Sequence, residues 1–313
     1  MYKKHLTKFF TAIILIAVSL ITNGQGSTST QKVIGPKFTE GIVYSKTSFP
    51  GHQLNDTIKT LEFENGDYVE QYNVIQALKK YQQSIKATDE QSIKDAFFIS
   101  GIMVTPAYSK MYFTPSKALI TTDALGYHQQ MLLNNADKSG TLILSDRDKS
   151  NQGTIFFKSD ELSAVWQKYQ VDAAQYSLQT SDETTMIAGY RCKKIVYTFG
   201  GTSRGMPVSN YVINLEPRKV TVWFSDELPA SLNVMHPHYF ELDKAILKYE
   251  VELDKNHKNK MLVEISKLQP QKIEEEKFEV KELAPSVEHK KGSYESGMMI
   301  MQVMMSSVSL LTK

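Results

Sequence analysis

The stretch from Gly189 to Pro229 restricts the possible fold of this chain more than any other segment does. Its two ends, Gly189–Phe199 and Lys219–Pro229, are rich in β-branched and aromatic residues and are stopped by Gly, Asp or Pro. Segments of this composition predict strands. The stretch holds Cys192, the only cysteine, and Trp223, one of the two tryptophans. No catalytic signature accompanies these residues, so the stretch predicts a β fold and names no reaction.

Residues 1–24 predict a secretory signal peptide. Three lysines precede a largely apolar run from Phe9 to Ile21, and small or polar residues follow it. A positive segment, a short apolar core and a small-residue cleavage zone are the plan of such a signal. The run is about thirteen residues long, and a membrane-spanning helix needs about 20. We therefore expect cleavage after Gly24, with an uncleaved anchor as the alternative, and a disordered leader over residues 25–37.

Charge and cysteine content restrict the function classes. The 313 residues include 36 Lys and Arg against 34 Asp and Glu, and removing residues 1–24 leaves 33 against 34. A near-neutral chain disfavours nucleic acid, which attracts a basic surface. A single cysteine cannot form an internal disulfide. We expect Cys192 to be a buried thiol, with intermolecular pairing as the alternative.

Hydrophobic periodicity predicts two early helices after a first strand at Phe38–Thr47. Apolar residues recur every three or four positions over 67–85, and a capping pattern opens a second, shorter helix over 88–97. Asn65-Gly66 offers a hairpin turn as the alternative to the first helix. Residues 58–63 predict a short strand or an extended loop. The apolar stripe of the first helix predicts core packing, and a ligand-lining face is the alternative reading.

Short strands separated by turn residues fill most of the remaining chain, which predicts a meandering antiparallel sheet. Residues 162–176 predict a helical turn, and residues 273–280 form a mostly charged segment anchored by Phe278. The further strands are expected at Ile99–Thr105, Lys110–Phe113, Lys117–Thr122, Tyr127–Asn134, Thr141–Ser145, Thr154–Lys158, Ile246–Leu253 and Lys260–Leu268.

The C-terminal segment Gly297–Leu311 contains five methionines. It is too short to span a membrane, and methionine side chains suit irregular apolar surfaces. We expect it to pack against the domain. Contact with a ligand groove or with a membrane surface is the alternative.

Polar motifs give no catalytic or metal site. His236 and His238 lack spaced partners that would complete a zinc site, so a surface loop is expected there. The segment 146–157 lacks the glycine and the glutamate that a calcium loop needs, which favours a hairpin turn. Arg191, Lys193 and Lys194 surround Cys192, but no general base accompanies it. We expect no enzyme activity, no metal and no cofactor.

The central stretch resembles a family of exported Gram-negative envelope proteins of unknown function. That family carries an "I-x-G-Y-K-C-x-K" strand and a "V-W-x-x-x-E-L-P" strand, which match Ile187–Lys194 and Val222–Pro229 here, with Arg191 in place of the lysine. The matching motif residues are Gly189, Tyr190, Cys192, Trp223, Leu228 and Pro229.

The family is grouped with the outer-membrane lipoprotein-carrier (LolA-like) fold, and the GLPGLI family is a neighbour, although that hexapeptide is absent here. Weaker matches at Phe38–Tyr44, Ala245–Glu250 and Lys277–Val280 extend the resemblance over about residues 38–283. That range is the expected domain, and residues 284–313 form the expected Met-rich tail.

The resemblance implies an α+β, mainly β fold: a curved antiparallel sheet that forms an incomplete β-barrel, with helices on its concave face. It implies a non-catalytic protein of the periplasm or outer envelope that binds a lipid or a lipoprotein acyl chain in the concavity, as carrier or sensor. The expected lining residues are Tyr72, Ile75, Leu78, Trp223 and Phe224.

Two other functions stay open. One is an envelope scaffold that binds a protein partner through a sheet edge or face, without a ligand cavity. The other is a hydrolase whose catalytic residues are scattered through the sequence. Peripheral contact with a membrane is compatible with both the lipid-binding function and the scaffold function.

Overall fold

The computed structural model describes residues 38–59, 68–86, 89–158, 161, 169–170, 175–201, 206–208, 211–213, 217–236, 238–239, 242–252, 260–290 and 294–312. The expected signal peptide and leader, and most of the expected helical turn at 162–176, lie outside these ranges.

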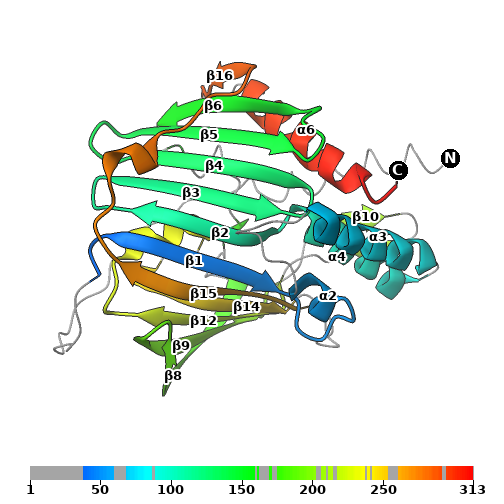
Figure 1. Ribbon diagram of the computed structural model, residues 1–313. Coiled ribbons are helices and arrows are strands. Elements are labelled where there is room, and N and C mark those ends of the chain that lie inside the picture. Colours follow the sequence, from blue (N-terminus) through cyan, green and yellow to red (C-terminus); the bar gives the residue numbers. More distant parts are fainter. Residues whose placement is uncertain are drawn as a thin grey trace.

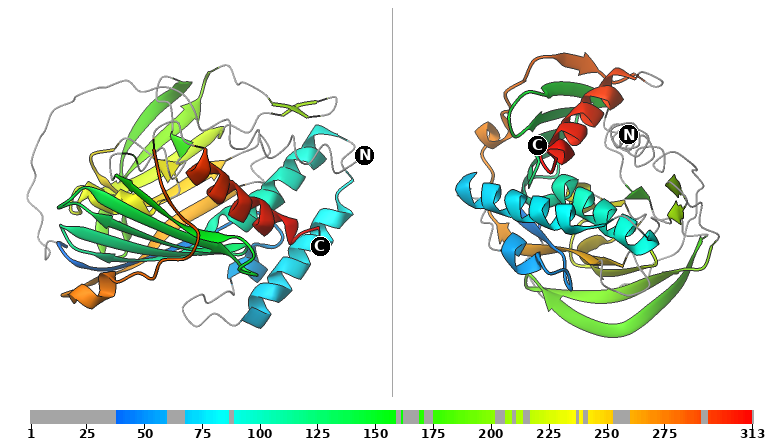
Figure 2. Two further views of the ribbon diagram at one scale, coloured as in Figure 1. Left: turned by 90° about the horizontal axis from the view of Figure 1, so that it is seen from above. Right: turned by 90° about the vertical axis from the view of Figure 1, so that its right-hand side faces the viewer.

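A 12-stranded sheet forms the body of the protein (Figure 1). Its strand order is β16-β6-β5-β4-β3-β2-β1-β15-β14-β12-β9-β8. Every neighbouring pair is antiparallel except β16 and β6, which are parallel. The edge strands β16 and β8 do not pair with each other, so the sheet is open, and Figure 2 shows it bent rather than flat. The prediction of a mainly β fold is confirmed.

The strands of this sheet have the following bounds: β1 (Gly41–Ser48), β2 (Pro106–Phe113), β3 (Lys117–Ala124), β4 (Tyr127–Asn134), β5 (Ser139–Asp146), β6 (Gln152–Lys158), β8 (Tyr176–Ile187), β9 (Tyr190–Phe199), β12 (Lys219–Ser225), β14 (Ala245–Glu252), β15 (Lys260–Pro270) and β16 (Ser286–Glu288). Two further strand pairs lie outside it: β10 (Met206–Val208) with β11 (Tyr211–Ile213), and β7 (Tyr169–Gln170) with β13 (His238–Tyr239).

Four α-helices accompany the sheet in the described part of the chain: α2 (Asn55–Lys59), α3 (Tyr68–Ser84), α4 (Glu90–Val104) and α6 (Glu295–Ser309). The described residues also include two 3₁₀ helices, η4 (Ala230–Met235) and η5 (Glu275–Phe278). The first expected helix is confirmed as α3. The short strand or extended loop expected at 58–63 is wrong at its start, because Ile58 lies in α2, and residues 60–67 lie outside the described ranges.

Helix α4 corrects the strand expected at Ile99–Thr105. The helix begins after Asp89, whose side chain accepts from the Ser92 amide at 2.8 Å and completes a capping box, and it continues to Val104. Its residues Phe97, Phe98, Ile99, Ile102 and Met103 are all buried. A helix buried on nearly every side has the same composition as a buried strand, which explains the error.

Alternate residues of β1–β6 point to one face of the sheet, which we call the helix-covered face. Its core residues form a sheet cluster with side chains of η4 and α6: Val43, Met111, Met131, Leu142 and Ile155 with Leu232 and Val303. A second, α4 cluster joins Ile99, Ile102 and Met103 to Val222, Tyr249 and Val263. Val263 and Ile265 belong to different clusters but alternate along β15 on one face, so both clusters cover the same side.

The opposite, outer face is mostly polar. There η5 packs Phe278, together with Ile273, against Ile42 and Leu119.

Helix α6 lies across strands β4–β6 (Figure 2) and also contacts α4. Two glycines allow α6 to pack closely against the sheet. A Cβ on Gly126 would lie 2.8 Å from the Ser307 hydroxyl oxygen, and a Cβ on Gly153 would overlap with the Met299 side chain. Met299, Val303 and Leu311 are buried. The expected packing of the Met-rich tail is confirmed. Within the described ranges, no helix combines the length and the apolar character that crossing a bilayer requires.

Candidate functional site

The five expected lining residues do not form one cluster. On α3, Tyr72 is 61% exposed, whereas Leu78 is fully buried and Ile75 packs beside it in the α4 cluster. Phe224 packs against the same α4 cluster, and Trp223 packs against the sheet cluster. The structure therefore brings together Ile75, Leu78 and Phe224 and separates Tyr72 and Trp223 from them.

Trp223 has charged neighbours. The ammonium of Lys248 lies 4.9 Å from the centre of the Trp223 ring, within the range of a cation–π interaction. Lys248 also forms an ion pair with Glu264 at 3.2 Å, and Lys194 is the cross-strand partner of Trp223 on β9. These contacts are typical of a solvated sheet face.

The family motif residues build a turn and part of the core. Ile187 pairs with Tyr190, so Ala188 and Gly189 form a two-residue hairpin loop with φ values of 48° and 88°. Loops of this length favour positive φ at both positions, which explains the glycine. Leu228 is buried, and Pro229 precedes the first residue of η4.

Cys192 is fully buried and free. Burial raises the pKa of its thiol to about 12. A hydrogen bond involving the Ile187 backbone lowers this pKa, and the Glu227 and Glu264 carboxylates raise it slightly. Thiolates are the reactive form of cysteine. The geometry therefore agrees with the expected buried, structural thiol.

His236 corrects the expected surface loop. It is 1% exposed, and its Nε2 lies 2.7 Å from the backbone carbonyl of Ile246. Asn233 binds the same segment twice, because its amide donates to the Lys244 carbonyl at 2.8 Å and accepts from the Ile246 amide at 2.7 Å. These bonds attach η4 to β14, so His236 supports the fold from inside. The side chain of His238 lies outside the described residues.

Asp146 ends β5 at the expected hairpin turn. Its carboxylate accepts from Ser150 and Asn151, through both backbone amides and both side chains, at 2.8–3.1 Å. Burial opposes ionisation, but hydrogen bonds from Ser306 of α6, Asn151 and Ser150 outweigh it and lower the pKa of Asp146. The carboxylate thus stabilises the turn and fastens α6 to it.

An Asp–His pair lies on the outer face. Asp123 of β3 and His128 of β4 are cross-strand partners, and the Asp123 Oδ1 and His128 Nδ1 atoms are 2.8 Å apart. Ser145 of β5 is the next partner in line. Among the described residues, however, no hydrogen bond joins the Ser145 hydroxyl to His128, so a nucleophile–base contact is missing from this arrangement.

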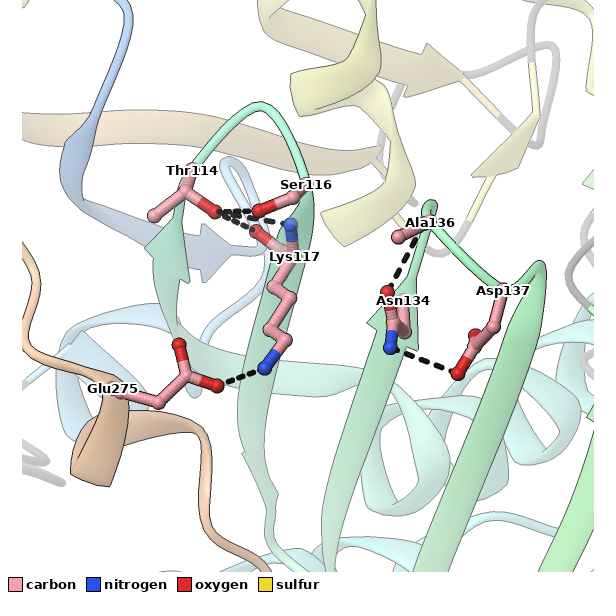
Figure 3. A network of polar contacts seen from close by, with 7 residues as sticks. All are labelled: Thr114, Ser116, Lys117, Asn134, Ala136, Asp137 and Glu275. Carbon is pink, nitrogen blue, oxygen red and sulfur yellow. Dashed lines mark hydrogen bonds and ion pairs between the residues drawn. The ribbon is translucent and has the colours of Figure 1, made fainter.

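The hairpin ends carry a separate polar network (Figure 3). Thr114 Oγ1 accepts from the Lys117 amide at 3.0 Å, and Asn134 donates to Asp137 at 3.0 Å. Lys117 forms an ion pair with Glu275, which attaches η5 to the outer face. Short-range bonds of this kind stabilise turns, and this network therefore belongs to the scaffold.

A polar row on the helix-covered face is the least expected feature. Ser45, Ser109, Thr122 and Gln129 are successive cross-strand neighbours on β1–β4, and each is at most 4% exposed. Ser109 and Thr122 share a hydrogen bond of 3.0 Å, but Gln129 Oε1 has no hydrogen-bond partner among the residues that the structure describes. The hydroxyl of Tyr127, two residues earlier on the same face, also has no partner in the described part of the chain.

Sequence reasoning missed this row, although it contains a usable signal. Gln129 occupies an inward position in the alternation Tyr127, Gln129, Met131 of β4. A polar residue at an inward strand position needs a partner or a function.

Comparison with known proteins gives little further guidance. No protein-family model matches the chain, and no curated protein matches it. A structure titled "Structure of PNGF-II in P21 space group" shares 11% identity over 85% of this chain and 34% of that chain, with a TM-score of 0.36. A second structure, "Structure of PNGF-II in C2 space group", shares 12% identity over 63% of this chain and 30% of that chain, with a TM-score of 0.32. The chain thus spans about a third of the length of PNGF-II, and likeness at this level carries no argument about fold or function.

Proposed function

We propose that this is a non-catalytic protein of the periplasm or outer envelope that binds the acyl chain of a lipid or lipoprotein. The ligand chain lies between the helix-covered face and α6. The single observation that carries the proposal is the packing of a Met-rich helix onto the apolar face of an open sheet. The incomplete barrel of the lipoprotein-carrier-like fold, with its helices on the concave side, is part of this proposal.

Helix α6 suits a ligand-responsive cover. Met304 and Ile300 pack against the sheet cluster while partly exposed, and Met305 packs against the α4 cluster. Methionine side chains are unbranched and polarisable, so they can repack around an inserted chain at low cost. Each buried methylene contributes about 0.8 kcal/mol, so a chain of about sixteen carbons offers on the order of 10 kcal/mol before ordering costs.

The test is native mass spectrometry of the secreted protein, purified without detergent. We expect one co-purifying lipid per chain, and uptake of a fluorescent fatty acid after its removal. Met304→Glu places a charge where α6 meets the sheet cluster and should abolish uptake. Met298→Glu is the matched control because Met298 is 45% exposed on the same helix, and it should bind as the unaltered chain does. Absence of both lipid and uptake in the unaltered chain would contradict the proposal.

A second candidate is an envelope scaffold that binds a protein by strand addition. It is favoured by the edge strand β8, on which Leu178 and Met186 are 55% and 64% exposed. Open strand edges pair readily with other chains. Leu178→Lys with Met186→Lys should abolish partner capture from envelope extracts without changing lipid uptake. Loss of lipid uptake in that variant would argue against two separate sites.

A further inference from the structure

The polar row interrupts a face that is otherwise apolar. Its neighbours on β4 and β5, Met131, Leu142 and Leu144, are each at most 2% exposed. Gln129 Oε1 and the Tyr127 hydroxyl are buried there, and no described residue forms a hydrogen bond with either atom. Burying such atoms without partners destabilises a fold, so each calls for an explanation. A ligand group that hydrogen-bonds to them would provide one.

The row lies at the end of the face where two helices meet. The amide of Gly126, next to Tyr127, donates to the carbonyl of Met103 in α4 at 3.1 Å. The same glycine lies against Ser307 of α6. A ligand group at Tyr127 and Gln129 would therefore sit beneath the junction of α4 and α6. An attached chain would extend along the apolar positions towards Met131 and Leu133.

The charged residues on and near this face indicate which kind of ligand group it favours. The inward positions of β1–β6 include no Lys or Arg, and Asp146 lies opposite Tyr127 across β4 and β5. The nearby Arg147 guanidinium donates to the Leu125 carbonyl at 3.1 Å and to the Ala124 carbonyl, and it lies 4.0 Å from Asp123 Oδ1. A carboxylate or phosphate would thus be buried without a dedicated cation, which is costly. A neutral hydroxyl or amide would not pay that cost.

We propose that Gln129 and Tyr127 bind the neutral, hydrogen-bonding head of a single-chain lipid, such as the hydroxyl of a monoacylglycerol or the amide of a fatty amide. Gln129 Oε1 accepts a hydrogen bond from the head, and the Tyr127 hydroxyl donates to it or accepts from it. Thr122 and Ser109 continue the polar row on the next two strands. This inference rests on the proposed function, since it names the head of the acyl ligand.

The test measures displacement of N-phenyl-1-naphthylamine from the lipid-free mature chain at pH 8, with 1-monomyristoylglycerol and with myristate. We expect the monoacylglycerol to bind at least fivefold more tightly than myristate. Gln129→Leu and Tyr127→Phe should each weaken monoacylglycerol binding about three- to tenfold, the effect of one hydrogen bond, and leave myristate binding unchanged. Gln130→Leu, the next residue on the outer face, is the matched control and should change neither.

Melting temperatures of the lipid-free variants separate a binding role from a structural one. Replacing a buried amide oxygen that has no partner should leave the melting temperature of Gln129→Leu equal or raised. A lowered melting temperature with unchanged lipid preference would overturn the inference and assign the row to the fold. Equal affinities for both lipids in every variant would also overturn the inference. In that case the proposed acyl site would remain, and an internal water would bind the polar row. If neither lipid displaces the probe, the proposed function fails together with the inference.

Discussion

Gly153 of β6 lies directly under Met299 of α6, and a Cβ at Gly153 would also come within 2.8 Å of the backbone carbonyl oxygen of Pro285. A flexible methionine can move aside, but the backbone of the segment leading to β16 cannot do so cheaply. Gly153 therefore sets how closely α6 approaches the sheet.

We predict that Gly153→Ala destabilises the protein by about 1–3 kcal/mol, because it overpacks this contact. Gly101 in α4 is the matched control, since no neighbouring atom of the described residues lies within 4 Å of its added Cβ. Gly101→Ala should stabilise by about 0.5–1 kcal/mol through helix propensity. Urea unfolding of both variants measures the difference, and equal stabilities would contradict the close packing of α6.

The buried thiol of Cys192 should resist modification. With its pKa raised to about 12, roughly one thiol in ten thousand is ionised at pH 8. We predict no labelling by iodoacetamide in the folded chain over hours and complete labelling in urea. Rapid labelling of the folded chain would show that Cys192 is accessible and would reopen a reactive role for it.

Asp146 should make stability depend on pH. Hydrogen bonds from Ser306, Asn151 and Ser150 lower its folded-state pKa below the ordinary 3.8. The carboxylate therefore stabilises the fold above its unfolded-state pKa, and this contribution is lost as the pH falls through the lower folded-state pKa. Asp146→Asn should lower the free energy of unfolding by about 1–3 kcal/mol at pH 7. This difference from the unaltered chain should shrink below about pH 4. Urea midpoints at pH 7 and pH 3 measure it, and a deficit independent of pH would contradict this role.

The hairpin loop between β8 and β9 should respond oppositely to changes at its two positions. Ala188 has φ of 48° and Gly189 has φ of 88°, and residues with a Cβ lose about 1–2 kcal/mol in that region. Ala188→Asn should stabilise by about 0.5–1 kcal/mol, because Asn-Gly is the preferred pair for such loops. Gly189→Ala should destabilise by about 1–2 kcal/mol. Thermal unfolding of both variants checks the signs, and matching signs would exclude this turn type.

Much of the fold could be predicted from the sequence, because several strands alternate and end at turn residues. Expected strands in the region 110–158 agree with β2–β6 within a few residues. Two errors have physical reasons. Residues 97–104 are apolar on nearly all sides, so periodicity could not separate a buried helix from a strand. The edge strand β8 is largely exposed on both faces and therefore shows no alternation.

The candidate site was harder to predict, because it depends on register between distant strands. Gln129 looks like an ordinary surface glutamine until its position opposite Thr122, on the face that α6 covers, is known. The expected lining residues followed aromatic and aliphatic content, which does not separate exposed Tyr72 from buried Leu78 on the same helix. Local sequence reports composition and period, and only the tertiary pairing tells which polar atoms lack partners.

The most direct test of the central claim is a chain-length series. Affinities of the lipid-free protein are measured by calorimetry for saturated fatty acids and for 1-monoacylglycerols of eight to sixteen carbons, each below its aggregation concentration. A chain buried against the helix-covered face gains about 0.8 kcal/mol per methylene, so we predict that affinity rises up to about fourfold per carbon and levels off when the face is filled. Affinity that is absent, or that does not change with chain length in either series, would contradict an acyl-binding site.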